Sequence, residues 1–451
     1  MISTHNGSLA ARDSYGIATG LPATGARVAI SGFPRAAHEE LARLLEFHGY
    51  QPSAFATGAD AVLVPEATPE ILEEAERSGR RILLRSQLQD EQQPLPSRTP
   101  VEITEKWVRI LDVTLPRRPA GSSLVPPAER FAHLCFDKTF LTAARAVAIA
   151  ADAGLPCALE GETAVAKTTA VLFIAHLCRQ DAVRLNLNGQ SDTGELVGRF
   201  VPSTERAPAP QWTFREGIVP QAMRHGHWVL LDEANLVADG SVIERLNSVL
   251  EQPATLLLSE NAGERFGVGG DIPVAESFRI FATMNPATYA ARAALSPAFR
   301  DRFSLWNVLE SPGEAEYRAL LIRLVHGVHP EFALDGVVWQ AADELPLYPQ
   351  LNDCRGMDDL LGAIAAFHAS VAAASGGDGG ADLGRGRREP YVFTRRTLMA
   401  LMSIFAARVE RGQPVECAAR EALDIVYLQR VNPGPDRHAM RTALRSAGLA
   451  R

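Results

Sequence analysis

Short apolar runs that alternate with helical stretches give the first two thirds of this chain an α/β pattern. Runs bounded by Gly, Ser or charged residues are typical of buried strands. We expect such strands at 27–30, 61–64, 82–84, 157–160, 183–187 and 279–283, and another within 227–235. Apolar residues at steps of three and four predict helices at 37–48, 69–78, 131–153 and 168–178. Strands separated by helices indicate parallel pairing with right-handed crossovers.

From residue 314 onward the pattern is helical. It predicts helices at 314–327, 336–345, 356–373, 394–410 and 413–430. A Gly-rich insertion at 374–388 and a leader at 1–25 are expected to be flexible. A Pro-rich linker is expected at 91–127, although 101–115 partly alternates like a hairpin or an edge strand. The predicted folded domains are a small α/β domain at 26–90, a larger α/β domain at 128–312 and a helical domain at 313–451.

Composition narrows the class of protein. The net charge of −8 gives no bulk attraction to nucleic acid or acidic lipid. Five cysteines without a CxxC pair favour reduced thiols in a cytoplasm over a disulfide framework or a zinc site. The first residues lack the basic and apolar regions of a signal peptide, and no apolar run approaches membrane-spanning length. We therefore expect a cytoplasmic protein without membrane contacts.

The stretch 159–169, LEGETAVAKTT, carries the most specific chemistry. Gly161, Lys167 and Thr168 stand at the spacing of a Walker A loop, G-x-x-x-x-G-K-[ST]. In such a loop the backbone N–H groups face a phosphate chain, the lysine binds the β/γ-phosphates and the threonine hydroxyl binds Mg²⁺. The residues predicted to hold a nucleotide here are Gly161, Glu162, Thr163, Ala164, Val165, Ala166, Lys167, Thr168 and Thr169.

Two features of this loop bear on the assignment. The chain has only three lysines among its 45 Lys and Arg residues, and one of them, Lys167, holds the phosphate-binding position. Ala166 replaces the second glycine of the pattern. Because alanine tolerates a positive φ poorly, we expect the loop to differ locally there. The alternative, an ordinary Gly/Ala-rich strand-to-helix turn, is disfavoured by the motifs downstream.

Polar residues follow two later strands. Asp232 and Glu233 end the run HWVLLDEAN, and Asn285 follows the strand at 279–283. Ligands bind at the carboxyl ends of strands in open α/β sheets. There Asp232 would hold Mg²⁺, Glu233 would polarise the attacking water and Asn285 would position that water. Taken singly, the acids could be solvated charge, and the asparagine a turn residue before Pro286.

The segment LSPAFRDRF places two arginines after these motifs. Either Arg302 or Arg300 could reach the phosphates of a neighbouring subunit as an arginine finger. The alternative is a surface ion pair with Asp301 or Glu310.

Together these motifs resemble, in order, those of AAA+ ATPases of the MoxR and dynein/midasin-related group. The resemblance covers roughly 130–310 and includes WTFREGIVPQAMRHGHWVLLDEANL and FRIFATMNPATYAARAALSPAFRDRF. It implies an α/β AAA+ P-loop NTPase fold, a three-layer structure with a parallel sheet and a C-terminal helical lid, that binds ATP and Mg²⁺. An alanine before the Walker lysine is common in MoxR-type loops, whereas Ala164 departs from the glycine of many members.

The resemblance also implies features outside the loop. Inserts at 196–217 and 256–273 would contact substrate, the second as a hairpin. An arginine at the start of a lid helix would reach the nucleotide, Arg396 by register and Arg395 as the alternative, unless both are solvated. Members of the group act as homo-oligomeric rings, most often hexamers. They use hydrolysis to remodel a protein client, for which the resemblance suggests a von Willebrand A-domain protein.

The small domain at 26–90 weakly resembles a BRCT domain. The resemblance rests on Ser31-Gly32 after a strand, a helix ending in His48-Gly49, and the run GRRIL. The segment 26–90 contains no tryptophan, the residue usual in the last BRCT helix, and no lysine follows in its second helix. A docking or spacer module is the alternative.

Two other functions are compatible with the sequence. One is a nucleic-acid-directed NTPase, restriction-type or targeted to DNA by the BRCT-like domain, against which the acidic balance argues. The other is a nucleotide-gated scaffold with little turnover, against which Glu233 and Asn285 argue.

Overall fold

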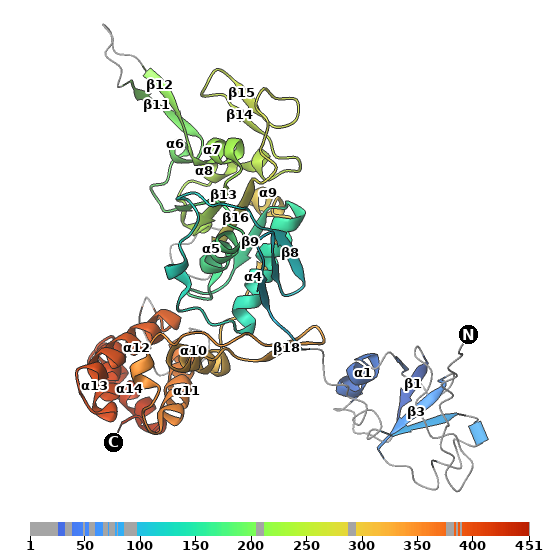
Figure 1. The fold of residues 1–451 in the computed structure, drawn as a ribbon, viewed down its shortest axis with the longest axis vertical. Coiled ribbons are helices and arrows are strands. Elements are labelled where there is room, and N and C mark those ends of the chain that lie inside the picture. The colour runs from blue at the N-terminus through green and yellow to red at the C-terminus, as the bar shows by residue number, and fades with distance from the viewer. Residues whose placement is uncertain are drawn as a thin grey trace. The chain divides into compact units, whose positions relative to one another are not determined.

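The protein divides into two compact units, Met1–Pro96 and Ser97–Arg451, which we describe separately (Figure 1). The structure is a computed structural model. It describes residues 26–31, 38–47, 50–53, 59–65, 71, 77–78, 80–84, 97–203, 212–286, 295–375, 383–384, 387 and 390–450.

The first unit is built on a small parallel sheet. Its strands, in the order β2-β1-β3-β4, are β2 (Gln51–Ser53), β1 (Arg27–Ile30), β3 (Ala61–Val64) and β4 (Arg81–Leu84). Helix α1 (His38–Phe47) contributes Leu41 and Leu45 to the core. The predicted strands are confirmed, and β2 is an addition. Gly32, Gly49, the leader at 1–25 and most of the helix expected at 69–78 lie outside the described residues, so the BRCT-like resemblance stays a prediction.

A five-stranded parallel sheet forms the centre of the second unit. In spatial order its strands are β10 (Ala182–Asn186), β13 (Trp228–Asp232), β16 (Arg279–Met284), β9 (Cys157–Glu160) and β17 (Leu305–Val308). The apolar runs predicted all of these except β17. Because β13, β16 and β9 are neighbours, the segments after their carboxyl ends meet at one edge of the sheet.

Helices cover both faces of this sheet, as the predicted three-layer architecture requires. Along β9, Leu159 packs in one core with α4 (Lys138–Ala153) and α5 (Lys167–Leu177). Its neighbour Ala158 packs in a second core with α7 (Ile218–His225). This division follows from the two-residue period of a strand, which turns successive side chains to opposite faces.

The segment before the sheet differs from the prediction in two respects. Part of the expected linker at 91–127 is folded, as β5 (Ser97–Arg98) and the antiparallel strands β6 (Val101–Ile103), β7 (Trp107–Ile110) and β8 (Val113–Pro116). Val108 and Leu115 pack against the face of α4. The helix expected at 131–153 begins only at Lys138, since the Asp137 side chain caps it by accepting from the Phe140 N–H at 2.9 Å.

Both expected inserts contain hairpins. The first is β11 (Gly198–Pro202) with β12 (Trp212–Glu216), and the second is β14 (Leu256–Leu258) with β15 (Glu264–Phe266). Figure 1 shows that both project from the sheet at the end away from the C-terminal helices. Short elements complete this part of the chain: η2 (Ala128–Phe131), α6 (Thr193–Leu196), η3 (Ala234–Leu236), α8 (Ser241–Glu244), η4 (Asn247–Val249) and α9 (Pro297–Asp301).

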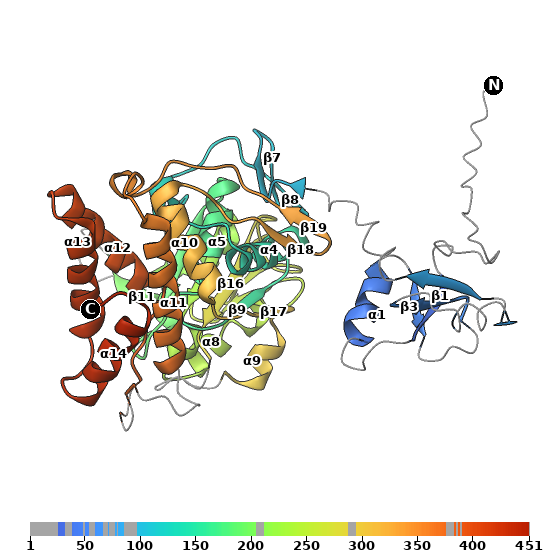
Figure 2. The ribbon, with the colours of Figure 1, turned by 90° about the horizontal axis from the view of Figure 1, so that it is seen from below.

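The C-terminal residues form a helical lid with its own core. Its elements are α10 (Glu314–His326), η5 (Pro349–Leu351), α11 (Met357–Ser375), α12 (Arg395–Glu410), α13 (Val415–Leu423), the π-helix η6 (Asp424–Leu428) and α14 (Pro435–Ser446). Figure 2 shows these helices gathered beside the sheet domain. Helix α14 was not predicted. The helix expected at 336–345 is wrong: β19 (Val337–Trp339) lies in this range and pairs with β18 (Phe332–Leu334) in a hairpin, and residues 340–345 are not helical.

One helix among the described residues, α11, is long and apolar enough to cross a membrane by length and composition alone. In the structure its residues Leu361, Ile364 and Phe367 are buried in the core of the lid. This burial is typical of the core helix of a globular domain.

Candidate functional site

The side chain of the Walker lysine, Lys167, folds back over the loop between β9 and α5 and contacts backbone carbonyl groups of that loop. The Nζ of Lys167 donates to the carbonyl oxygens of Gly161 at 2.6 Å and Glu162 at 2.7 Å. It also donates to Oδ1 of Asn285 at 2.9 Å, across from β16. The lysine is 7% exposed. The loop therefore holds a nearly buried positive charge at the carboxyl edge of the sheet, where the sequence predicted it.

The loop keeps a left-handed backbone at both alanines, which corrects the expectation of a local difference at Ala166. The φ angles are 66° at Ala164 and 68° at Ala166, which is the N-cap of α5. A Cβ makes this conformation unfavourable by roughly 1–2 kcal/mol per residue. The loop geometry is thus maintained at the expense of backbone strain.

Replacing Ala166 with Gly should relieve this strain and raise the free energy of unfolding by about 1 kcal/mol, since glycine adopts positive φ without penalty. Urea denaturation would measure it. Ala170→Gly, in the interior of α5, is the matched control and should lower stability by about 1 kcal/mol. A lower free energy of unfolding in Ala166→Gly than in wild type would contradict the inference that the backbone is strained at this position.

Gly161 is needed for a different reason from Ala166. Its φ is not positive, but an added Cβ would come within 3.1 Å of the Leu309 carbonyl oxygen and 3.2 Å of Leu309 Cβ. The glycine therefore permits close packing against the segment that follows β17.

The carboxylate of Asp232 lies beside Thr168. Its Oδ1 accepts from Thr168 Oγ1 at 2.7 Å and from the hydroxyl of Thr283, and the Asp232 residue is 3% exposed. Burial alone would raise the pKa of this carboxyl. The hydrogen bonds from Thr283 and Thr168 and the nearby charge of Arg184 outweigh burial and hold the pKa below its usual value. Asp232 is therefore ionised at neutral pH.

The side chains of Glu233 and Asn285 face each other. The Nδ2 of Asn285 is 3.3 Å from each carboxylate oxygen of Glu233, and Asn235 Nδ2 donates to the Asn285 carbonyl at 2.7 Å. Glu233 itself has a φ of 59°. Asn285 thus contacts Lys167 through its oxygen and Glu233 through its nitrogen, and it joins the three predicted residues in one hydrogen-bonded chain.

The residues present fit a bound Mg²⁺. A hydroxyl and an ionised carboxylate, both oxygen ligands, meet at 2.7 Å between Thr168 and Asp232. Among the described residues there is no cluster of three or more His, Cys, Asp or Glu that could hold a metal ion. Mg²⁺ commonly takes few protein ligands and completes its shell with phosphate oxygens and water.

The same residues line a cavity of about 160 Å³ between the sheet domain and the lid. Its lining includes Thr163, Ala164, Ala166, Lys167, Thr168, Thr169, Asp232, Glu233, Asn285, Arg395 and Arg396. Arg395 is held by Asp137 at 2.8 Å, whereas Arg396 is exposed. Both lid arginines thus border the cavity, and the choice of Arg396 over Arg395 stays a prediction.

The two candidate finger arginines lie outside this cavity. Arg300 stacks over the ring of Trp306 at 4.4 Å and lies 3.8 Å from Glu160. Arg302 Nε donates to Glu251 at 3.2 Å. A role at phosphates would therefore require the site of a second copy of the chain.

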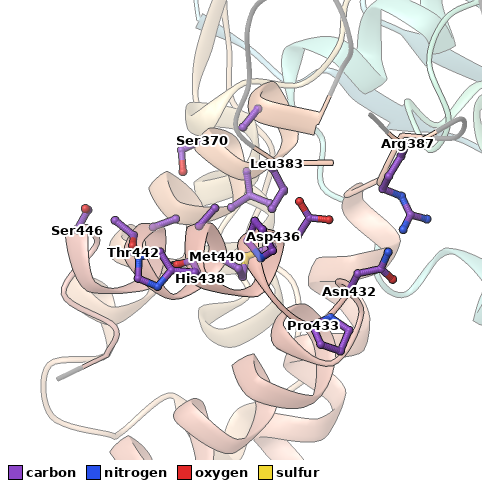
Figure 3. Close-up of a pocket in the computed structure, with 15 residues that line it drawn as sticks. Ser370, Leu383, Arg387, Asn432, Pro433, Asp436, His438, Met440, Thr442 and Ser446 are labelled. Atoms are coloured by element: carbon purple, nitrogen blue, oxygen red, sulfur yellow. Dashed lines mark hydrogen bonds between the residues drawn. The ribbon is translucent and has the colours of Figure 1, made fainter. Parts of the chain in front are cut away.

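A larger groove of about 1050 Å³ lies within the lid (Figure 3). Helices α11 and α14 line it, with Leu383 and Arg387 from the Gly-rich insertion, most of which lies outside the described residues. None of the predicted site residues lines this groove. We therefore assign the groove no part in phosphate chemistry, although it is larger than the cavity at the Walker loop.

The residue that sequence reasoning missed is Arg184. It lies on β10, and its Nε donates to Asp232 Oδ2 at 2.7 Å. The sequence shows it only as one arginine among many. The contact exists because β10 pairs with β13, and the local sequence pattern does not predict which strands are neighbours.

The parallel sheet of the order β10-β13-β16-β9-β17, with a helical lid, has the P-loop NTPase fold of the AAA+ class. It carries a Walker-type loop, an acidic pair and a polar strand end. Residues 156–303 match the family model of the AAA domain of the dynein-related subfamily. This part of the chain is therefore a dynein-related AAA domain, and the predicted α/β AAA+ fold is confirmed.

The chain is also similar to short parts of two midasins. The chain is 35% identical over 147 residues to midasin of Dictyostelium discoideum and 33% identical over 149 residues to midasin of Giardia intestinalis. These matches cover 32% and 33% of this chain but only 2% and 3% of the midasins. A solved structure of a Cytophaga hutchinsonii protein, described as a candidate ATPase, aligns over 70% of this chain and 92% of its own. The identity is 15% and the TM-score is 0.32.

Proposed function

We propose that this protein binds ATP with Mg²⁺ and hydrolyses it. The observation that carries the proposal is the hydrogen-bonded chain from Lys167 through Asn285 to Glu233, beside the Thr168–Asp232 pair. These residues come from the ends of β13 and β16 and the start of α5, yet they surround one cavity. A phosphate-binding cation, two Mg²⁺ ligands and a water-activating carboxylate are the groups that phosphoanhydride hydrolysis requires.

In this mechanism each side chain has a separate task. Lys167 and the backbone N–H groups of the loop bind the β/γ-phosphates, and Thr168 and Asp232 hold Mg²⁺, which supplies charge neutralisation on the phosphates. Glu233 polarises the attacking water, and Asn285 fixes the orientation of the Glu233 carboxylate and of that water. Arg396 contributes positive charge from the lid.

The active form would be a homo-oligomeric ring, most often a hexamer in this class, with Arg302 or Arg300 of one copy completing the site of the next. Turnover would drive remodelling or activation of a protein client, for which a von Willebrand A-domain protein is the class suggested by the resemblance. The hairpins β11–β12 and β14–β15 are candidate client contacts, since Trp212 and Phe200 are exposed on the first. We place the protein in the cytoplasm, in line with five free cysteines.

A phosphate-release assay with a fluorescent nucleotide titration tests this function. Wild-type protein should bind ATP. Its release of phosphate should require Mg²⁺. Lys167→Ala should weaken ATP binding by roughly tenfold to a hundredfold, because it removes the charge that meets the β/γ-phosphates. Lys106→Ala, at an exposed lysine in the β6–β7 turn, is the matched control and should bind normally.

The two steps of the proposal can fail separately. Wild-type protein that bound ATP without releasing phosphate would overturn hydrolysis and favour the nucleotide-gated scaffold. Equal ATP affinity in the Lys167→Ala and Lys106→Ala variants would overturn the phosphate site itself.

A further inference from the structure

Asp232 is held by a positive charge as well as by two hydroxyl groups. The guanidinium of Arg184 donates from Nε to Oδ2 at 2.7 Å, and a second nitrogen of the same group forms an ion pair with that oxygen. The other oxygen, Oδ1, receives the hydroxyls of Thr168 and Thr283. The carboxylate of Asp232, which would bind Mg²⁺, therefore already forms an ion pair with the Arg184 guanidinium.

Arg184 approaches Asp232 from outside the phosphate cavity. It is not among the residues that line that cavity, and it extends from β10, the edge strand of the sheet. The arginine side chain is 40% exposed, whereas that of Asp232 is 5% exposed. This geometry gives Arg184 access to the carboxylate and to solvent. It is the position of a counter-ion rather than of a phosphate ligand.

We propose that Arg184 lowers the Mg²⁺ affinity of the nucleotide site by sharing the charge of Asp232. The inference rests on the proposed function, because it assigns Mg²⁺ to Thr168 and Asp232. A cation at that pair meets a carboxylate whose charge is partly neutralised, and it is repelled by the guanidinium, with little screening in a partly buried site.

Removing the arginine should not disorder the carboxylate. Thr168 and Thr283 hold Oδ1 from α5 and β16, independently of β10. A neutral residue at position 184 therefore leaves Asp232 in place and increases its effective negative charge. Tighter binding of a divalent cation is the consequence.

The test is a Mg²⁺ titration of the full-length protein with a fluorescent ADP analogue, which avoids turnover. Arg184→Gln should lower the Mg²⁺ concentration at half-saturation by about tenfold, while ADP affinity in EDTA stays as in wild type. Arg184→Lys, which keeps the charge, should stay near wild type. Arg224→Gln is the matched control, since Arg224 is 38% exposed and pairs with Glu216 outside the phosphate cavity. Should Arg184→Gln be unstable without metal, Arg184→Met keeps the apolar stem and gives the same comparison.

The outcomes separate this inference from the proposed function. An unchanged or higher half-saturating Mg²⁺ concentration in Arg184→Gln overturns the counter-ion role. Loss of ADP affinity in EDTA also overturns it, because Arg184 would then be a phosphate ligand. Failure of wild-type protein to bind ADP at any Mg²⁺ concentration refutes the nucleotide site as a whole, and the inference with it.

Discussion

Glu233→Gln should bind ATP as tightly as wild type and hydrolyse it about a thousandfold more slowly. In this proposal the Glu233 carboxylate polarises the attacking water, and general-base catalysis is typically worth 10²–10⁴-fold. Glutamine has the same length and can still accept from Asn285 Nδ2, which lies 3.3 Å from both Glu233 oxygens. The substitution thus removes the base without removing the hydrogen-bonded chain to Lys167.

The measurement pairs equilibrium ATP binding with steady-state phosphate release. Glu244→Gln, an exposed acid on the neighbouring helix α8, is the matched control and should hydrolyse ATP at the wild-type rate. Hydrolysis by Glu233→Gln at the rate of that control would refute the assigned base. Pull-down with the Glu233→Gln variant in ATP is then a direct route to the client, because the ATP-bound state persists.

The proximity of the candidate site residues could be predicted, because it follows from their order along the chain. The lysine, the acidic pair and the asparagine each follow a short apolar strand, and parallel strands carry such residues to the same edge. The structure adds the contacts between them, above all that Asn285 links Lys167 to Glu233. It also shows that Ala166 adopts the conformation expected of glycine.

The errors have identifiable physical causes. Strand β19 lies within the helix predicted at 336–345. Asp335-Gly336, a strong turn signal, separates β19 from β18, and the φ angles of these two residues, 51° and 72°, form the tight turn. The helix predicted at 131–153 includes Asp137, which is a residue typical of an N-cap and precedes the first turn of α4. Both signals were local and available. The contact of Arg184 with Asp232 depends instead on the spatial order of the strands, which no periodicity reveals.

The proposed arginine finger is the part of the site that a single copy cannot display. Arg300 is engaged within its own domain, stacked on Trp306, whose Nε1 donates to Glu160 at 2.9 Å. Arg302, at the end of α9, pairs with Glu251, whose side chain is 53% exposed. An exposed ion pair of this kind is worth at most about 1 kcal/mol. The Arg302 guanidinium also donates to the Ala298 carbonyl at 2.6 Å, and it would exchange both partners for the phosphates of another copy.

Arg302→Ala should therefore reduce ATP turnover by about a thousandfold with ATP affinity nearly unchanged, since a finger acts on the charge that develops in the transition state. Arg300→Ala is the matched comparison and should lose less than about tenfold, through local packing around Trp306. Mixing inactive Arg302→Ala with inactive Glu233→Gln should restore part of the activity, because some interfaces then combine an intact base with an intact arginine. A base and a finger supplied by the same copy could not be restored in this way, and absence of recovery in mixed oligomers would contradict a shared site.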